Sequence, residues 1–237
     1  MFDNLGLIVS RLSEGLSTTV IAAVGGIALT VVLSLVAGLG MLSPVAVLRG
    51  ISRTYVEFFR GTSEIVQLFW IFFALPALTG FQIVPLAAAI LVLALNHGAY
   101  GGEIVRGAVQ SVPRAQYEGA LALSLSSRDR MLRVILPQAL VEMLPPFNNL
   151  FIQLLKSTSL LSLVVVTEIT FIANSLRAAL PVSEQLTVYA VLLLMYLVLS
   201  LLITAGMRWL ERRAAARLGR TRATPRINSR LHKEQAA

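Results

Sequence analysis

The sequence predicts an all-α integral membrane protein with about five transmembrane helices. Of its 237 residues, 56% are hydrophobic and 14% are charged, and the mean hydropathy is +0.77. A soluble domain carries about 25% charged residues, so this composition and its repeated apolar runs indicate a chain embedded in lipid. The start lacks a basic region and a small-residue cleavage site, so we expect the first apolar segment to be retained as a span.

Five apolar windows are each long enough to cross a hydrocarbon core of about 30 Å, which needs roughly 20 residues of helix. They cover residues 16–42, 55–78, 84–104, 146–172 and 187–210. The sequence therefore predicts a transmembrane domain over residues 1–212, followed by a basic cytoplasmic tail over residues 213–237 that is partly disordered.

The basic residues predict the orientation. Three lie in the loop and adjoining helix ends between the first two spans, five between the third and fourth, and nine from the end of the fifth onward, which makes 17 of the 20. Because basic residues gather in cytoplasmic segments, the N-terminus is predicted outside and the C-terminus inside. The net charge of +8 then reflects topology rather than binding of nucleic acid.

The segment over residues 110–137 is predicted to lie in the cytoplasm and to form two short amphipathic helices. They cover residues 115–123 and 129–135, with turn-prone serines between them, and Pro137 is expected to end the second. Such helices suit either docking onto a soluble partner or contact with lipid headgroups, and the composition favours neither.

Glu64 stands at the start of the second predicted span. A charge at membrane depth is costly and is a functional candidate by default. Glu64 either pairs with Arg60, four residues earlier, or faces a solute pathway where it meets an ammonium or amidinium group, with Gln67 on the same face.

Lys156 and Glu168 fall within the fourth window. Lys156 is interpreted as a structural lysine that satisfies carbonyls at a helix break or pairs with Glu142 or Glu168. The alternative is contact with a substrate carboxylate, in which Thr158 and Ser159 would share. Glu168 has the same two interpretations.

Asn96 and His97 interrupt the third span. A hydrogen bond to a neighbouring helix is the preferred interpretation, and contact with a zwitterionic solute is the alternative. Gly98 and Gly102 form a G-x-x-x-G pattern that predicts close helix packing. Glu103 is expected to pair locally near the cytoplasmic end, three residues before Arg106.

The sequence indicates no enzymatic centre. It contains no G-x-x-x-x-G-K-[ST] motif to hold nucleotide phosphates, and its two histidines and lack of cysteine predict no metal site and no cofactor in this chain.

The segment around Glu118 resembles the EAA loop of bacterial ABC-importer permeases, which have the type I importer fold. The positions in register are Glu118, Gly119, Ala120, Ser124, Val134, Leu136 and Pro137. Three of them depart from the pattern: Gly119 replaces Ala, Ser124 replaces Gly and Val134 replaces Ile. Residues 61–70, 94–113 and 145–163 resemble the polar amino-acid permeases, and most closely those assigned to ectoine and hydroxyectoine. The likeness runs from about residue 10 to residue 212. Ser124 replaces the family's glycine, and a left-handed backbone there costs a serine about 1 kcal/mol or more.

The resemblance implies a permease subunit of an ATP-driven importer for polar amino acids or small zwitterions in the bacterial inner membrane. It implies three kinds of partner: a second permease, identical or paralogous; a cytoplasmic ATPase dimer that binds ATP and Mg; and an extracytoplasmic solute-binding protein. The EAA loop would couple ATPase closure to alternating access through Glu118, Gly119, Ala120, Ser124, Leu136 and Pro137. The alternatives are a secondary transporter and a channel subunit, against which stand the few spans and the lack of an obvious inverted repeat.

Overall fold

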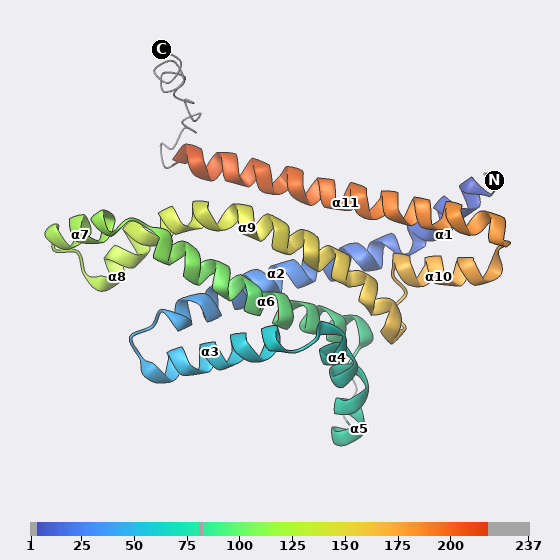
Figure 1. The fold of residues 1–237 in the computed structure, drawn as a ribbon, viewed down its shortest axis with the longest axis horizontal. Coiled ribbons are helices and arrows are strands. Elements are labelled where there is room, and N and C mark those ends of the chain that lie inside the picture. Colours follow the sequence, from blue (N-terminus) through green and yellow to red (C-terminus); the bar gives the residue numbers. More distant parts are fainter. Residues whose placement is uncertain (1–3, 81–82, 218–237) are drawn as a thin grey trace, which may run out of the picture.

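The computed structural model describes residues 4–80 and 83–217, and this part of the chain is entirely helical, without strands. Figure 1 shows α2, α6, α9 and α11 side by side, with α7 and α8 at one end of the bundle and α1 and α10 at the other. The α-helices are α1 Leu5–Glu14, α2 Leu16–Met41, α3 Ala46–Gly61, α4 Glu64–Phe69, α5 Leu75–Thr79, α6 Pro85–Ser111, α7 Arg114–Ala122, α8 Ser127–Asp129, α9 Leu136–Ser157, α10 Ile169–Ala179 and α11 Val182–Arg217. Two π-helical turns, Trp70–Ala74 and Arg130–Ile135, and a 3-10 helix, Thr158–Val164, complete them.

Three helical stretches are long and apolar enough to cross a membrane: Leu5–Met41, Pro85–Ser111 and Val182–Ala216. Two bent pairs raise the total to five. Ala46–Gly61 meets Glu64–Thr79 at 102°, and Ser127–Val164 meets Ile169–Ala179 at 53°. The predicted five spans thus require that each bent pair is counted as one.

The predicted spans over residues 55–78 and 146–172 correspond to the two bent pairs, and each is broken in the structure. At the first break, Thr62 and Ser63 are extended, and the Thr62 hydroxyl donates to the Phe58 carbonyl at 2.8 Å. At the second, Val165 is left-handed with φ 61°. A side-chain hydroxyl that donates to a helix-end carbonyl lowers the free-energy cost of such a break within a membrane protein.

Close packing joins α2 to α6 through glycines. A Cβ on Gly98 would lie 2.8 Å from the Cβ of Leu33, and one on Gly38 would lie 2.7 Å from the carbonyl oxygen of Gly102. Neither helix could approach so closely with larger residues, so the predicted role of the Gly98 and Gly102 pair is confirmed.

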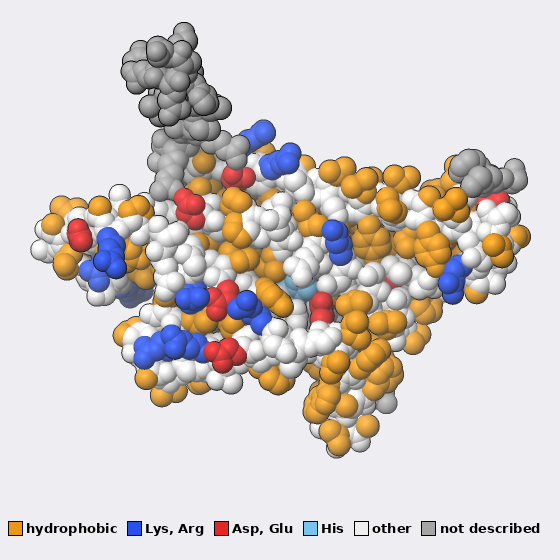
Figure 2. Space-filling model, in the orientation of Figure 1, with side chains coloured by type: hydrophobic (Ala, Val, Ile, Leu, Met, Phe, Trp, Pro, Cys, Tyr) orange, Lys and Arg blue, Asp and Glu red, His pale blue; other side chains and the backbone are white. Residues whose placement is uncertain are grey.

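The surface is apolar along the bundle and charged at one end. Figure 2 shows hydrophobic side chains over the arm formed by α4 and α5, where large residues are exposed. Basic side chains lie at the end that carries α7, α8 and the start of α3, as the charge pattern predicts (Figure 2). Which end faces the cytoplasm remains a prediction from that pattern.

The segment over residues 110–137 contains the end of α6, α7, a turn at Ser124, α8 and a π-helical turn. The prediction that Pro137 ends the second helix is wrong, since Pro137 lies in the first turn of α9 and the chain continues as helix to Ser157. The wider π-helical turn just before it accommodates a residue that has no N–H. Of the predicted tail, α11 takes residues up to Arg217, and the rest lies outside the described residues.

Candidate functional site

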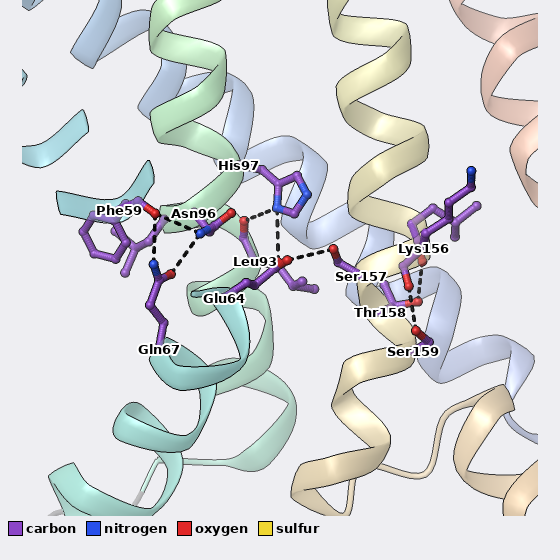
Figure 3. A network of polar contacts seen from close by, with 12 residues as sticks. Phe59, Glu64, Gln67, Leu93, Asn96, His97, Lys156, Ser157, Thr158 and Ser159 are labelled. Atoms are coloured by element: carbon purple, nitrogen blue, oxygen red, sulfur yellow. Dashed lines mark hydrogen bonds and ion pairs between the residues drawn. The ribbon is translucent and has the colours of Figure 1, made fainter. Parts of the chain in front are cut away.

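Glu64 lies where three helices meet, as Figure 3 shows. It is the first residue of α4, and its Oε2 accepts a hydrogen bond from the Ser157 hydroxyl, at the end of α9, at 2.9 Å. Its Oε1 lies 3.4 Å from Nδ1 of His97 on α6, and the side chain is 18% exposed. The carboxylate thus contacts two other helices, and its Oε1 is buried although the side chain as a whole is partly exposed.

The predicted helical pair of Arg60 and Glu64 is wrong. Arg60 instead lies 3.6 Å from Glu103, which also pairs with Arg106 at 2.6 Å as predicted. The cause is the break after Gly61, which turns α4 by 102° and takes Glu64 off the face of α3 that carries Arg60.

Gln67 and Asn96 serve this same break. Both donate to the carbonyl oxygen of Phe59, at 3.0 and 3.1 Å, and Asn96 also donates to Oε1 of Gln67 at 3.2 Å (Figure 3). A carbonyl left free at membrane depth would cost several kcal/mol. The preferred interpretation of Asn96, a hydrogen bond to a neighbouring helix, is therefore confirmed. The side-chain amides of Gln67 and Asn96 both donate to the backbone.

Glu168 lies at the second break. It is fully buried and caps α10, because its two oxygens accept from the backbone N–H groups of Thr170 and Phe171, both at 2.7 Å. The hydroxyl of Tyr196 on α11 donates to Oε2 at 3.1 Å. Thr158, also buried, donates its hydroxyl to the Leu155 carbonyl at 2.7 Å.

Lys156 is exposed and forms no ion pair with a carboxylate in the part of the chain that the structure describes. The predicted pair with Glu168 is absent, because Tyr196 and the start of α10 occupy that carboxylate. Figure 3 shows the lysine pointing away from Glu64. It lines a crevice of about 290 Å³ with Ser159, Thr170, Tyr189, Leu192, Leu193 and Tyr196.

The predicted pathway residues thus separate into two groups. Glu64, Gln67 and Asn96 surround the first break, and Lys156, Thr158, Ser159 and Glu168 surround the second. Ser157 and His97 join Glu64 in the first group. The sequence did not predict either of these contacts, because Glu64 and Ser157 are 93 positions apart and no local pattern links them.

The segment around α7 presents small, exposed residues on a fixed support. Glu118 and Gly119 are exposed, and a Cβ on Gly119 would meet nothing within 4 Å. Ala120 packs inward, and the Tyr117 hydroxyl donates to the Val109 carbonyl at the end of α6 at 3.1 Å. Burial raises the pKa of Tyr117, against the effect of the Arg130 charge.

Ser124 adopts the left-handed conformation that glycine favours, with φ 55°. Two backbone hydrogen bonds stabilise this strained turn. The Ser124 N–H donates to the Leu121 carbonyl at 2.8 Å, and the Leu125 N–H donates to the Ala120 carbonyl at 3.1 Å. Leu136 and Pro137 are half-buried where this segment joins α9.

Several known proteins are similar to this chain. A probable amino-acid ABC transporter permease, y4tF of Sinorhizobium fredii, is 48% identical over 73% of this chain and 74% of its own length. The glutamine transport system permease GlnP of Escherichia coli is 36% identical over 85% and 92%, and the L-cystine transport system permease TcyB of Bacillus subtilis is 34% identical over 85% and 86%.

Solved structures have the same fold. An amino acid ABC transporter crystallised with histidines matches with a TM-score of 0.80 and 27% identity, over 90% of this chain and 98% of that one. The MetNI methionine transporter, at 19% identity, shares the fold with a TM-score of 0.67 over 90% and 99%. The family model described as the binding-protein-dependent transport system inner membrane component matches residues 26–216. The chain therefore belongs to this family of multi-pass inner-membrane transport components.

Proposed function

We propose that this chain is the permease subunit of an ABC importer for polar amino acids or related small zwitterions. The observation that carries the proposal is the family match over residues 26–216, together with relatives whose names state transport of amino acids, glutamine and L-cystine. The chain works with a second permease, an ATPase dimer that supplies ATP and Mg chemistry, and a solute-binding protein.

The segment around α7 is the proposed coupling element. Its exposed Glu118 and Gly119, the packed Ala120 and the strained turn at Ser124 give a rigid surface on which an ATPase could seat. Leu136 and Pro137 continue this surface directly into α9, so a displacement of the segment reaches the bundle.

Arginine in place of Gly119 tests the coupling. Gly119→Arg adds a long charged side chain to the proposed contact and should lower solute-stimulated ATPase activity of the complete transporter in liposomes about tenfold or more. Gly107→Arg is the matched control, because a Cβ at Gly107 also meets nothing within 4 Å but lies outside α7. Equal activity of the two variants would remove the coupling role.

Glu64 is the proposed contact for the cationic group of the solute, because its carboxylate lies at the first break, its side chain is partly exposed and no described Lys or Arg lies within 4.0 Å of it. The solute is found by measuring uptake of L-glutamine, L-cystine, L-arginine, L-histidine, ectoine and hydroxyectoine. Ectoine carries a delocalised amidinium that would suit the same carboxylate, and its uptake alone would assign the finer substrate. Uptake that persists without ATP would favour a secondary transporter or a channel.

A further inference from the structure

The imidazole of His97 lies between two oxygen acceptors. Its Nδ1 is 3.0 Å from the Leu93 carbonyl oxygen, one turn earlier on α6, and 3.4 Å from Oε1 of Glu64 on α4 (Figure 3). A carbonyl oxygen only accepts, so the 3.0 Å contact is a hydrogen bond only if Nδ1 carries the hydrogen. The geometry therefore selects the tautomer in which Nδ1 is the donor.

The ring makes its polar contacts through this one nitrogen. Its side chain is 1% exposed, and Nε2 is buried without a hydrogen bond to any described residue. Packing and the hydrogen bond to the Leu93 carbonyl thus fix the direction of the N–H group, and Oε1 of Glu64 lies beside it, 3.4 Å from Nδ1.

Glu64 has few other positive neighbours. No Lys or Arg of the described residues lies within 4.0 Å of it, since Arg60 pairs with Glu103 and Lys156 points away. Ser157 holds Oε2, and Oε1 has no full hydrogen bond but faces Nδ1 of His97. The two contacts, from α9 and α6, set both the position and the rotation of the carboxylate.

We propose that His97 is a positioning residue for Glu64, whose carboxylate it holds toward the cationic group of the transported solute by the electrostatic attraction of the neighbouring Nδ1–H dipole. This rests on the solute contact proposed for Glu64 above. His97 itself is too deeply buried to touch a solute.

Two substitutions distinguish the roles of the two ring nitrogens of His97. In His97→Asn, the amide nitrogen is bonded to Cγ, as Nδ1 is, so the donor toward Glu64 is kept. In His97→Gln, the amide lies one bond further out, near the place of Nε2, and the donor at Nδ1 is lost. A structural role in which the ring only fills space would treat the two amides alike.

The tautomer can be read directly, because the chain has only two histidines. In a His232→Asn background, solid-state nitrogen NMR of ¹⁵N-histidine-labelled permease, assembled with its partners in lipid, should show Nδ1 protonated and Nε2 bare. Glu64→Gln should shift the Nδ1–H resonance, whereas Glu14→Gln, on exposed α1, should not. An Nε2–H tautomer, or no response to Glu64→Gln, would overturn the proposal.

Uptake of L-glutamine and of L-arginine, with the binding protein saturated, gives the functional test. His97→Gln should lower the rate about tenfold, because the nitrogen that faces Glu64 is lost, and His97→Asn should restore most of the loss. In a Glu64→Gln background, His97→Gln should add no further loss, because the positioned group is gone. Equal losses for the two amides contradict the positioning role, whereas unchanged uptake in Glu64→Gln alone contradicts the solute contact and leaves the NMR result to decide His97.

Discussion

The two helix breaks use a glutamate in opposite ways. At the first, Glu64 begins α4 without capping it, keeps 18% of its side chain exposed and has one oxygen without a hydrogen bond. At the second, Glu168 is fully buried and accepts three hydrogen bonds, two of them from the backbone of α10. The same residue type beside a helix break therefore caps a helix in one case and makes no cap in the other. The two breaks leave different backbone groups without a partner. Glu168 accepts from two N–H groups at the start of α10, whereas at the first break Gln67 and Asn96 donate to the Phe59 carbonyl, which a carboxylate could not satisfy.

Removal of the Glu168 carboxylate should give the largest change in stability. Glu168→Ala leaves two buried N–H groups and the Tyr196 hydroxyl without their acceptor, so the free energy of unfolding should fall by about 3 kcal/mol. Thermal unfolding of the purified chain in detergent measures this, with the exposed Glu14→Ala as control. If both variants unfold at the same temperature, Glu168 is not the structural member of the pair.

Glu64→Gln should instead separate transport from stability. The amide oxygen still accepts from Ser157, so we expect the unfolding free energy to change by only about 0.5 kcal/mol. Uptake should nevertheless fall about tenfold, because the charge is lost. A large drop in unfolding temperature would place Glu64 in the same structural class as Glu168 and erase the contrast.

Tyr196→Phe tests how much α11 contributes to the stability of the second break. The variant removes one of the three hydrogen bonds to Glu168 and should cost about 1 kcal/mol of unfolding free energy. Tyr189→Phe is the matched control, because its exposed hydroxyl makes only a 3.4 Å contact with Asn174. A loss at Tyr189 as large as at Tyr196 would mean that the cap does not depend on α11.

Lys156→Met should have the smallest effect. The lysine is exposed and pairs with no described carboxylate, and methionine keeps much of its apolar stem, so the unfolding free energy should stay within about 0.5 kcal/mol. A loss above about 1 kcal/mol, measured by the same thermal unfolding, would show that the crevice beside Tyr196 holds a partner for the ammonium.

Local features of the sequence predicted the spans and the packing well. Apolar windows and the glycines of α6 depend on neighbours along one helix, and both have their counterpart in the fold. The first break was missed because residues distant in sequence stabilise it: Asn96 reaches the Phe59 carbonyl across 37 positions, and Ser157 reaches Glu64 across 93. An i+4 rule pointed Glu64 at Arg60 only because it assumed that the helix continued.

The path of α9 has a mechanical consequence. The helix begins next to the segment around α7 and ends at Ser157, which contacts the Glu64 carboxylate. At 1.5 Å per residue, its 22 residues span about 33 Å between the two. Pro145 and Pro146 lie inside this helix. Because proline has no N–H, two successive backbone hydrogen bonds of the helix are missing there. We therefore expect α9 to bend most easily at these prolines, so that a displacement at one end of the helix would change the angle of the other end.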